Sequence, residues 1–185
     1  MNIEVEIKVK IIDFKEIKKE LVKFGKLKKS IRQIDEYYIP CHRNFFAHKP
    51  TPTEWLRVRT NPDKTIFEYD KSFDSKTGKH YYAEEYETEV SHPDEFKKIL
   101  KFLDFKKVVV IDKKREYWDC GDFEVCLDKV KGLGNFIEVE AKGKFKNSKV
   151  AREGCAEFLK KLGIKQERDE VKTGYPTLLL KNKKV

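Results

Sequence analysis

The chain has 185 residues, of which 39% are charged and 39% hydrophobic, and its formal net charge is +9. This length predicts a single domain with enough apolar residues for a core. The positive charge favours an anionic partner, which leaves open a nucleic acid, a phosphorylated small molecule or a membrane surface. Since no apolar run approaches the roughly 20 residues of a membrane span, we expect neither a membrane-spanning segment nor a signal peptide.

The four cysteines are Cys41, Cys120, Cys126 and Cys155, and none has a C-x-x-C spacing. Cys126 and Cys155 stand among apolar residues, which predicts buried thiols rather than metal ligands. We therefore expect neither a disulfide framework nor a zinc site, and a cytoplasmic location, where thiols stay reduced.

The first predicted strand spans residues 2–11. It leads into a helix that begins near Asp13, a candidate N-cap, and ends at Gly25. The apolar residues of this helix recur at helical spacing; they are Phe14, Ile17, Leu21 and Phe24. A strand that runs into an amphipathic helix is the first of three such units in the chain.

The middle of the chain predicts two strands, 55–60 and 65–73, joined by a turn at 61–64. A further strand at 85–90 leads into the second helix, which starts at Ser91 and Pro93. Four apolar residues follow on that helix at helical spacing, namely Phe96, Ile99, Leu100 and Leu103.

Residues 107–118 and 122–130 predict a hairpin, so we expect mostly antiparallel pairing. A strand at 136–142 then leads into the third helix, which starts at Ser148 and ends at Gly163. The Lys-rich tail at 181–184 is expected to fray, and we find no domain boundary.

Charged residues occupy alternate positions of the predicted strands, and alternate positions share one face of a strand. Two strands carry two Glu followed by two Lys; these residues are Glu4, Glu6, Lys8 and Lys10, and Glu138, Glu140, Lys142 and Lys144. Paired carboxylates suit Mg²⁺ or Mn²⁺, and nearby cations suit phosphates. One such strand is weak evidence, because a solvated sheet face would show a similar pattern.

The two signs of charge also segregate onto different strands. Arg57 and Arg59 share a face, as do Lys113, Arg115 and Tyr117, whereas carboxylates dominate other strands. An antiparallel barrel with these rows inside would be a charged tunnel, which needs metal ions and a polyanion because an unpaired buried charge costs several kcal/mol. An open sheet with its polar face toward water is the alternative.

Several motifs together resemble the CYTH superfamily, the triphosphate tunnel metalloenzymes, over nearly the whole chain. They are Glu4-Val5-Glu6-Ile7-Lys8, Arg32-Gln33-Ile34-Asp35-Glu36-Tyr37-Tyr38, Leu56-Arg57-Val58-Arg59, Glu85-Tyr86-Glu87, Lys113-Lys114-Arg115, and the stretch 126–140. The stretch 126–140 is the most specific. Together with the Gln-x-Asp-x-Tyr-Tyr segment it is most similar to the class IV adenylyl cyclase branch.

The resemblance implies an α+β fold over residues 1–185: a closed eight-stranded antiparallel β-barrel, or tunnel, with helices packed outside it. Such a tunnel binds a triphosphate and a divalent metal. Two departures are visible. Ala83-Glu84 stands where the family often has Arg, and Tyr69-Asp70-Lys71 shifts the family's lysine by one position, which would turn Lys71 outward.

We expect Mg²⁺ or Mn²⁺ to be held by carboxylates, with Asp128 and Glu87 as secondary candidates; the set is Glu4, Glu6, Glu138, Glu140, Asp128 and Glu87. The triphosphate is expected to be held by cations, with Lys71 and Lys129 as weaker candidates; the set is Lys8, Arg57, Arg59, Lys113, Arg115, Lys71 and Lys129. A second expected role for Lys8 is that of a base with a lowered pKa, which deprotonates the nucleophile directly or through Tyr37.

Two reactions fit these expectations, and both rely on positioning and electrostatics. One is cyclisation of ATP to cyclic AMP and pyrophosphate, toward which the branch resemblance tilts. The other is hydrolysis of thiamine triphosphate, inorganic triphosphate or a nucleoside triphosphate. A different class is a non-enzymatic module that binds RNA or polyphosphate, although the acidic rows would repel a nucleic-acid backbone. The oligomeric state is left open, with a homodimer as one alternative.

Overall fold

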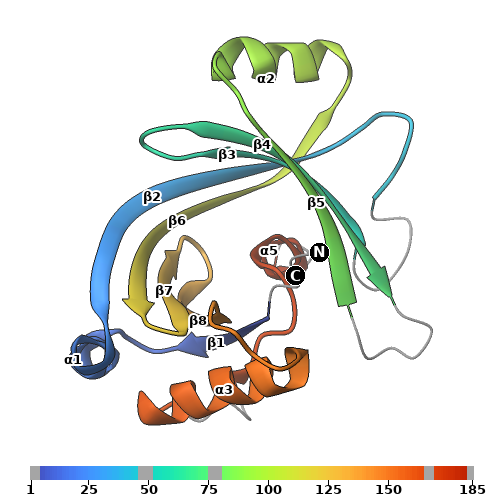
Figure 1. Ribbon diagram of the computed structural model, residues 1–185. Helices are drawn as coiled ribbons and strands as arrows, with labels where there is room; N and C mark the ends of the chain where they lie inside the picture. Colours follow the sequence, from blue (N-terminus) through green and yellow to red (C-terminus); the bar gives the residue numbers. More distant parts are fainter. Residues whose placement is uncertain (1–4, 46–51, 75–80, 165–168, 183–185) are drawn as a thin grey trace. The chain divides into compact units, whose positions relative to one another are not determined.

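The structure is a computed structural model that describes residues 5–45, 52–74, 81–164 and 169–182 (Figure 1). These residues form eight strands and four helices. The strands are β1 (Glu6–Ile11), β2 (Lys26–Ile39), β3 (Glu54–Thr60), β4 (Thr65–Asp74), β5 (Tyr81–Glu89), β6 (Lys106–Cys120), β7 (Phe123–Val130) and β8 (Gly134–Ala141). The helices are α1 (Lys15–Phe24), α2 (Pro93–Phe102), α3 (Ser148–Lys161) and α5 (Tyr175–Asn182).

The eight strands form one sheet in the order β1-β8-β7-β6-β2-β3-β4-β5. The hairpin pairs β3–β4, β4–β5, β6–β7 and β7–β8 are antiparallel, and so is the β1–β8 pair. An α+β fold with an eight-stranded antiparallel sheet is therefore confirmed. Closure into a barrel is not confirmed, because β1 and β5 stand at the two ends of the strand order in the described part of the chain.

Seven of the strands and three helices lie within a few residues of their predicted positions, but β2 and α5 were not predicted. Strand β2 escaped prediction because its first five residues, Lys26 to Ser30, are all exposed and carry no apolar alternation. Helix α5 covers part of the tail that we expected to fray; residues 183–185 lie outside the described residues. No helix in the ranges described above is both long enough and apolar enough to cross a membrane.

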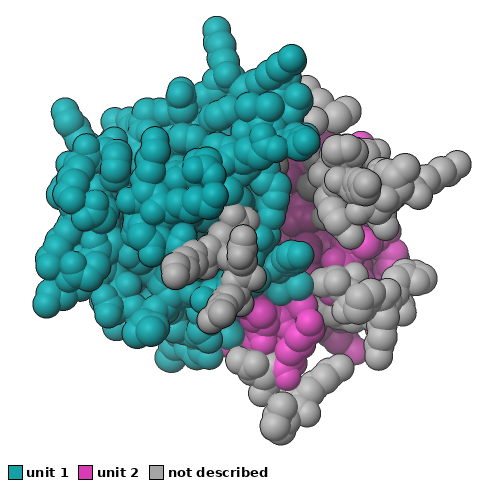
Figure 2. Space-filling view, turned by 90° about the horizontal axis from the view of Figure 1, so that it is seen from below, with its two compact units in different colours: residues 1–32, 113–174 teal, residues 33–112, 175–185 magenta. Residues whose placement is uncertain are grey.

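The chain divides into two compact units, coloured separately in Figure 2. Unit 1 comprises residues 1–32 and 113–174, and unit 2 comprises residues 33–112 and 175–185. Strands β2 and β6 each contribute residues to both units. The two units are described separately below, and the single domain over 1–185 stays a prediction.

In unit 1 the apolar core lies between one face of the strands and two helices. Odd-numbered apolar residues of β1, β7 and β8 face this core, and Val9, Val125 and Val139 are buried in it. Ile17 and Leu21 of α1 and Cys155 and Leu159 of α3 belong to the same cluster. Because successive strand residues point to opposite faces, this leaves the even-numbered residues of the same strands on the other face.

Three details fix the ends of these helices. The N-cap of α1 is Phe14, although the Asp13 carboxylate accepts a hydrogen bond from the Lys15 amide at 2.8 Å. At Gly25, a Cβ atom would lie 2.2 Å from the backbone oxygen of Asp119, so the close approach of the chain there requires glycine. The cap of α3 is Asn147, whose side chain accepts from the Val150 amide.

In unit 2 helix α2 covers the apolar face of β2, β3 and β4. Leu100 of α2 is buried with Tyr38, Leu56 and Val58, and the ring of Phe96 packs edge-on against Phe67 with 4.7 Å between their centroids. The opposite face of these strands carries Asp35, Tyr37, Arg57, Arg59 and Glu68, since these residues alternate with the apolar ones. In both units one sheet face is therefore charged and the other forms the core.

Candidate functional site

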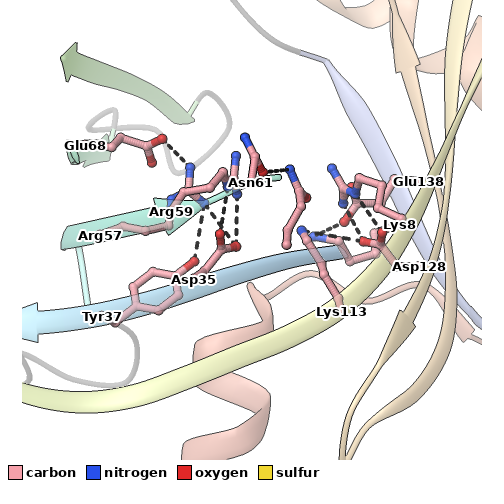
Figure 3. Close-up of polar contacts among 12 residues, drawn as sticks. Lys8, Asp35, Tyr37, Arg57, Arg59, Asn61, Glu68, Lys113, Asp128 and Glu138 are labelled. Atoms are coloured by element: carbon pink, nitrogen blue, oxygen red, sulfur yellow. Dashed lines mark hydrogen bonds and ion pairs between the residues drawn. The ribbon is translucent and has the colours of Figure 1, made fainter. Parts of the chain in front are cut away.

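The charged face of unit 1 is built by β1, β6, β7 and β8. Strand pairing sets Lys8 opposite Glu138 and Arg115 opposite Asp128. Figure 3 shows Lys8, Lys113, Asp128 and Glu138 with the contacts that join them. Four neighbouring strands thus bring together carboxylates and cations that are far apart in the sequence.

Glu138 is the centre of this group. Its side chain is only 8% exposed, its Oε1 lies 3.0 Å from Lys8 Nζ, and its Oε2 accepts a hydrogen bond from Arg115. Burial alone would raise the pKa of Glu138, but Arg115, Lys8 and Lys113 lower it well below its ordinary value. Glu138 is therefore an ionised carboxylate at neutral pH.

Lys8 is held in its charged form by the same contacts. Burial would lower its pKa, but Glu138 and then Glu6, which lies 3.5 Å away, raise it overall. The sequence-based expectation was a lowered pKa, which is not what the structure shows. The reason is that two carboxylates flank Lys8 and favour its charged form. A lysine that acts as a base needs apolar or cationic neighbours, which lower its pKa.

Asp128 is fully buried, and its two oxygens bind Arg115. The Arg115 Nε atom donates to Oδ1 at 2.6 Å, and Lys113 Nζ lies 3.8 Å from Oδ2. This bidentate pairing fixes the plane of the Arg115 guanidinium. Asp128 thus orients a predicted phosphate ligand in this structure, and its role as a metal ligand stays a prediction.

Among the described residues, the strongest candidates to bind a divalent cation are the carboxylates of Glu6, Glu138 and Glu140. Glu6 and Glu140 are direct partners in the β1–β8 ladder. Burial raises the pKa of Glu6, Lys8 lowers it, and the charges of Glu138 and Glu140 raise it. Among the described residues no three His, Cys, Asp or Glu side chains already converge as metal ligands. The like-charged carboxylate oxygens nonetheless fit a hard cation, which would relieve their repulsion.

In unit 2 the two arginines of β3 are held from β2 (Figure 3). Asp35 is 1% exposed and accepts two hydrogen bonds from Arg59, from Nε at 2.7 Å and from Nη2 at 3.0 Å. Its Oδ2 also lies 4.0 Å from Arg57 Nη1. One buried carboxylate therefore contacts both predicted phosphate ligands.

Arg57 is bound in a different way. Its Nη2 donates to Glu68 of β4, and its Nη1 donates to the Tyr37 hydroxyl at 3.4 Å. The Tyr37 ring packs edge-on against Trp55 with a centroid distance of 5.4 Å. Burial raises the pKa of Tyr37 although Arg57 opposes the shift, so the hydroxyl keeps its proton at neutral pH.

Four carboxylates face one another on β4 and β5, where Glu68 is paired with Glu87 and Asp70 with Glu85. The pKa of Glu87 is raised, first by its hydrogen bond with Glu68. Burial, Glu68 and Glu85 raise the pKa of Asp70 to about 7 although Arg57 lowers it. Glu87 is therefore a partner of Glu68 in the carboxylate group of unit 2.

The predicted residues divide into three groups. Brought together within unit 1 are Glu6, Lys8, Lys113, Arg115, Asp128, Glu138 and Glu140, and within unit 2 Tyr37, Arg57, Arg59 and Glu87. Lys71 shares the alternate positions of Phe67 and Tyr69 and so lies on the other face of β4 from Glu68. Lys129 is exposed and shares the face of Leu127, which is the core face. Glu4 lies outside the described residues.

Three residues of these networks were missed: Asp35, Glu68 and Asp70. A signal for Glu68 existed, because the four-residue turn at 61–64 pairs Thr60 with Thr65 and hence Arg57 with Glu68. Strand pairing gave no comparable signal for Asp35, since its strand was not predicted, although Asp35 stands in the Gln-x-Asp-x-Tyr-Tyr segment of the family resemblance. A signal for Asp70 did exist. In Tyr69-Asp70-Lys71 the family's lysine is shifted by one position, which leaves Asp70 on the strand face where the family has the lysine.

Comparison with known proteins gives matches over nearly the whole chain. The chain matches the CYTH domain over residues 2–174. The Methanocaldococcus jannaschii protein named "Putative adenylate cyclase MJ0240" is 35% identical over 167 residues, which cover 89% of this chain and 92% of that protein.

Solved structures show the same fold. The PH1819 protein from Pyrococcus horikoshii OT3 is 28% identical with a TM-score of 0.76, and the match covers 97% of this chain and 99% of that one. A Vibrio parahaemolyticus protein described as "a putative adenylate cyclase" is 16% identical with a TM-score of 0.74, over 97% of this chain and 98% of that one. At that identity the likeness concerns the fold alone.

Proposed function

Because the chain belongs to the CYTH family, we propose that it is an enzyme that acts on a triphosphate with the help of a divalent metal ion. The reaction that we place first is that of a class IV adenylyl cyclase, which converts ATP to cyclic AMP and pyrophosphate. The name of the Methanocaldococcus relative supports this choice. Hydrolysis of thiamine, inorganic or nucleoside triphosphate is the alternative. The closed barrel that the resemblance implies belongs to the same proposal.

The observation that carries the proposal is the way in which buried carboxylates hold cations on the charged face of each unit. Arg115 is fixed by Asp128 and Glu138, and Arg59 is fixed by Asp35. Guanidinium groups held in place by fixed partners need little reorganisation when a charged group binds. Such an arrangement suits the several negative charges of a triphosphate better than a single anion.

Both reactions need these charges for the same reason. In cyclisation, the ribose 3′-oxygen forms a bond to the α-phosphorus while the bond from that phosphorus to the β-bridging oxygen breaks. Pyrophosphate then leaves with the electron pair, and the hydroxyl proton passes to a base. In hydrolysis a water oxygen forms a bond to the terminal phosphorus instead, and the bond from that phosphorus to its bridging oxygen breaks. The diphosphate part of the substrate then leaves with the electron pair, and a water proton passes to a base. Bound cations stabilise the charge that develops on the phosphate oxygens in either case.

The protonation states of Lys8 and Tyr37 bear on the proton transfer. The pKa of each is raised, so each carries its proton at neutral pH in this structure. In that state Lys8 and Tyr37 donate hydrogen bonds to a substrate oxygen. We therefore propose them as groups that bind and orient the substrate, with Lys8 also contributing positive charge.

The residues that would hold a divalent cation are Glu6, Glu138 and Glu140, joined by Glu4. When bound, Mg²⁺ or Mn²⁺ would neutralise phosphate charge and order the phosphate chain. Asp128 and Glu87 are the secondary candidates. Each of these two already binds a residue of its own unit, Arg115 and Glu68 respectively.

A product assay tests the proposal. Purified protein is incubated with ATP, inorganic triphosphate and thiamine triphosphate, each with Mg²⁺, with Mn²⁺ and with a chelator. Cyclic AMP, pyrophosphate and orthophosphate are quantified separately. Equal amounts of cyclic AMP and pyrophosphate from ATP support the cyclase, and orthophosphate supports the triphosphatase. Glu6→Gln serves as the control for a contaminating enzyme, because its side chain is 47% exposed and we expect its replacement to leave the fold intact. Absence of any product, together with polyphosphate binding that metal weakens, would support the non-enzymatic module instead.

A further inference from the structure

Arg57 and Arg59 occupy alternate positions of β3, but their guanidinium groups are bound through different edges. Arg59 uses its Nε and Nη2 atoms, the side edge of the guanidinium, to bind both oxygens of Asp35. Arg57 uses its two terminal nitrogens, which donate to Tyr37 and Glu68. Its Nε atom is buried and makes no hydrogen bond within the described residues.

This difference decides what each arginine can offer to a phosphate. A guanidinium carries five N–H donors, and a phosphate is bound bidentately along one edge. With its side edge occupied by Asp35, Arg59 presents the edge formed by Nη1 and Nη2. No hydrogen bond or ion pair joins Nη1 of Arg59 to any other residue that the structure describes. The terminal edge of Arg57, by contrast, is already engaged.

Asp35 has the properties of an orienting group. It is 1% exposed, it lies on β2 beside β3, and strand pairing sets it directly opposite Arg59. Burial and the charge of Arg57 would lower the pKa of Arg59, but Asp35 and its hydrogen bond raise it overall. The two guanidinium groups therefore repel each other, and the carboxylate that contacts both keeps them together.

We infer that Asp35 is a positioning residue that holds the terminal edge of Arg59 ready for a phosphate of the substrate. This inference rests on the proposed function. It gives the two arginines different roles. Arg59 binds a phosphate through its terminal edge, Nη1 and Nη2, whereas Arg57 is anchored by Glu68 and donates a hydrogen bond to the Tyr37 hydroxyl. Asp35 itself does not touch the substrate.

A competing explanation makes the opposite prediction about binding. If Asp35 only balanced the positive charge of the arginines, its removal would raise the local positive potential and tighten the binding of a triphosphate. If it positions Arg59, its removal frees the guanidinium to rotate, and binding weakens because the bidentate geometry is lost. The sign of the change in affinity therefore separates the two explanations.

The test measures binding of bis(methylene)triphosphate, in which carbon replaces both bridging oxygens, by calorimetry with Mn²⁺. We expect Asp35→Asn to bind about tenfold more weakly than wild type or worse, which corresponds to about 1.4 kcal/mol. The matched control is Glu36→Gln, the next residue along β2, which removes one carboxylate, also buried, from the opposite face. This control should bind within about twofold of wild type.

A double-mutant comparison shows whether Asp35 acts through Arg59. In the Arg59→Lys background, Asp35→Asn should have little further effect, because lysine has no planar edge to orient. Independent, additive losses would overturn the inference. If Asp35→Asn does not fold, Asp35→Glu carries the test, because it keeps the negative charge but displaces the carboxylate that binds Arg59. A tenfold loss of affinity supports the inference, and binding within about twofold of wild type overturns it.

Binding by the wild-type protein distinguishes a failure of the proposed function from a failure of this inference. Wild-type protein that does not bind the analogue with either Mg²⁺ or Mn²⁺ would overturn the proposed function and this inference with it. Wild-type protein that binds, together with an Asp35→Asn variant that binds equally well or more tightly, would overturn the inference alone.

Discussion

Lys8 Nζ lies 3.0 Å from Oε1 of Glu138, and the two residues are direct partners in the β1–β8 ladder. The other carboxylate oxygen of Glu138 binds Arg115. Both Lys8 and Glu138 are nearly buried, at 11% and 8% side-chain exposure. The charged form of each residue therefore depends on the other. For this reason we expect the contact to affect the free energy of unfolding as well as function.

We predict that Glu138→Gln lowers the free energy of unfolding by about 3–5 kcal/mol, because it leaves Lys8 and Arg115 without their shared partner. Glu140→Gln is the matched control two residues along β8. Its carboxylate pairs with Lys142, whose side chain is 48% exposed, so the expected loss is about 0–1 kcal/mol. Urea denaturation of the three proteins measures both values. Equal, small losses in the two variants would show that the Lys8–Glu138 contact does not stabilise the fold.

Glu6→Gln should abolish metal-dependent turnover and leave the fold intact. The carboxylate is half-exposed, and its charge is repelled by Glu138 and Glu140, so its loss does not destabilise the protein. Wild-type protein should gain thermal stability when Mn²⁺ is added, since a ligand that binds only the native state stabilises it. The variant should gain little. Glu4→Gln, in the same strand motif, should behave alike. Full turnover in either variant would exclude that carboxylate as a required ligand.

Arg57→Lys and Arg59→Lys should reduce kcat nearly as much as the corresponding alanine variants, by roughly 10²–10³. Lysine keeps the charge but loses the planar guanidinium that Asp35 and Glu68 bind. The measurement is kcat at saturating substrate and Mn²⁺. Turnover within about threefold of wild type for both lysine variants, well under the tenfold that 1.36 kcal/mol produces, would show that this strand does not bind the phosphates.

Asp70→Asn should stabilise the protein in a pH-dependent way. The pKa of Asp70 is raised from 3.8 to about 7 in the native state, so native Asp70 keeps its proton while the unfolded chain loses it. The stability that this group contributes is complete below its unfolded pKa, and it is lost as the pH rises toward about 7. The free energy of unfolding of the variant should therefore exceed that of wild type. The difference should grow as the pH rises from 3.8 to about 7 and stay constant at higher pH.

Glu36→Gln is a control for which we expect the opposite dependence of stability on pH. Burial raises the pKa of Glu36, but Lys107 and Lys97 lower it overall, so its contribution is present above the ordinary value of 4.5 and is lost as the pH falls below it. Urea unfolding at a series of pH values measures both variants. A margin for Asp70→Asn that does not change with pH would show that Asp70 is ionised in the native protein.

Part of the site was predictable from the sequence for a simple reason. Residues two apart in a strand share a face, so Arg57 joins Arg59, and Lys113 joins Arg115, wherever those strands lie. Short turns add the pairing within a hairpin, which is why Arg57 and Glu68 could be matched through the turn at 61–64. Family motifs then indicated the chemistry that these rows serve, and the match to the CYTH domain confirmed the family.

Only the tertiary structure decided which charges neutralise which. Glu138 and Glu140 are equivalent in the sequence pattern, yet Glu138 is enclosed by Lys8 and Arg115 while Glu140 pairs with the more exposed Lys142. Asp35 reaches Arg59 from a strand whose exposed first half gave no signal in the sequence. Strand periodicity acts over neighbouring residues, whereas burial, register and the pKa of each group depend on partners that the fold brings from distant positions in the chain.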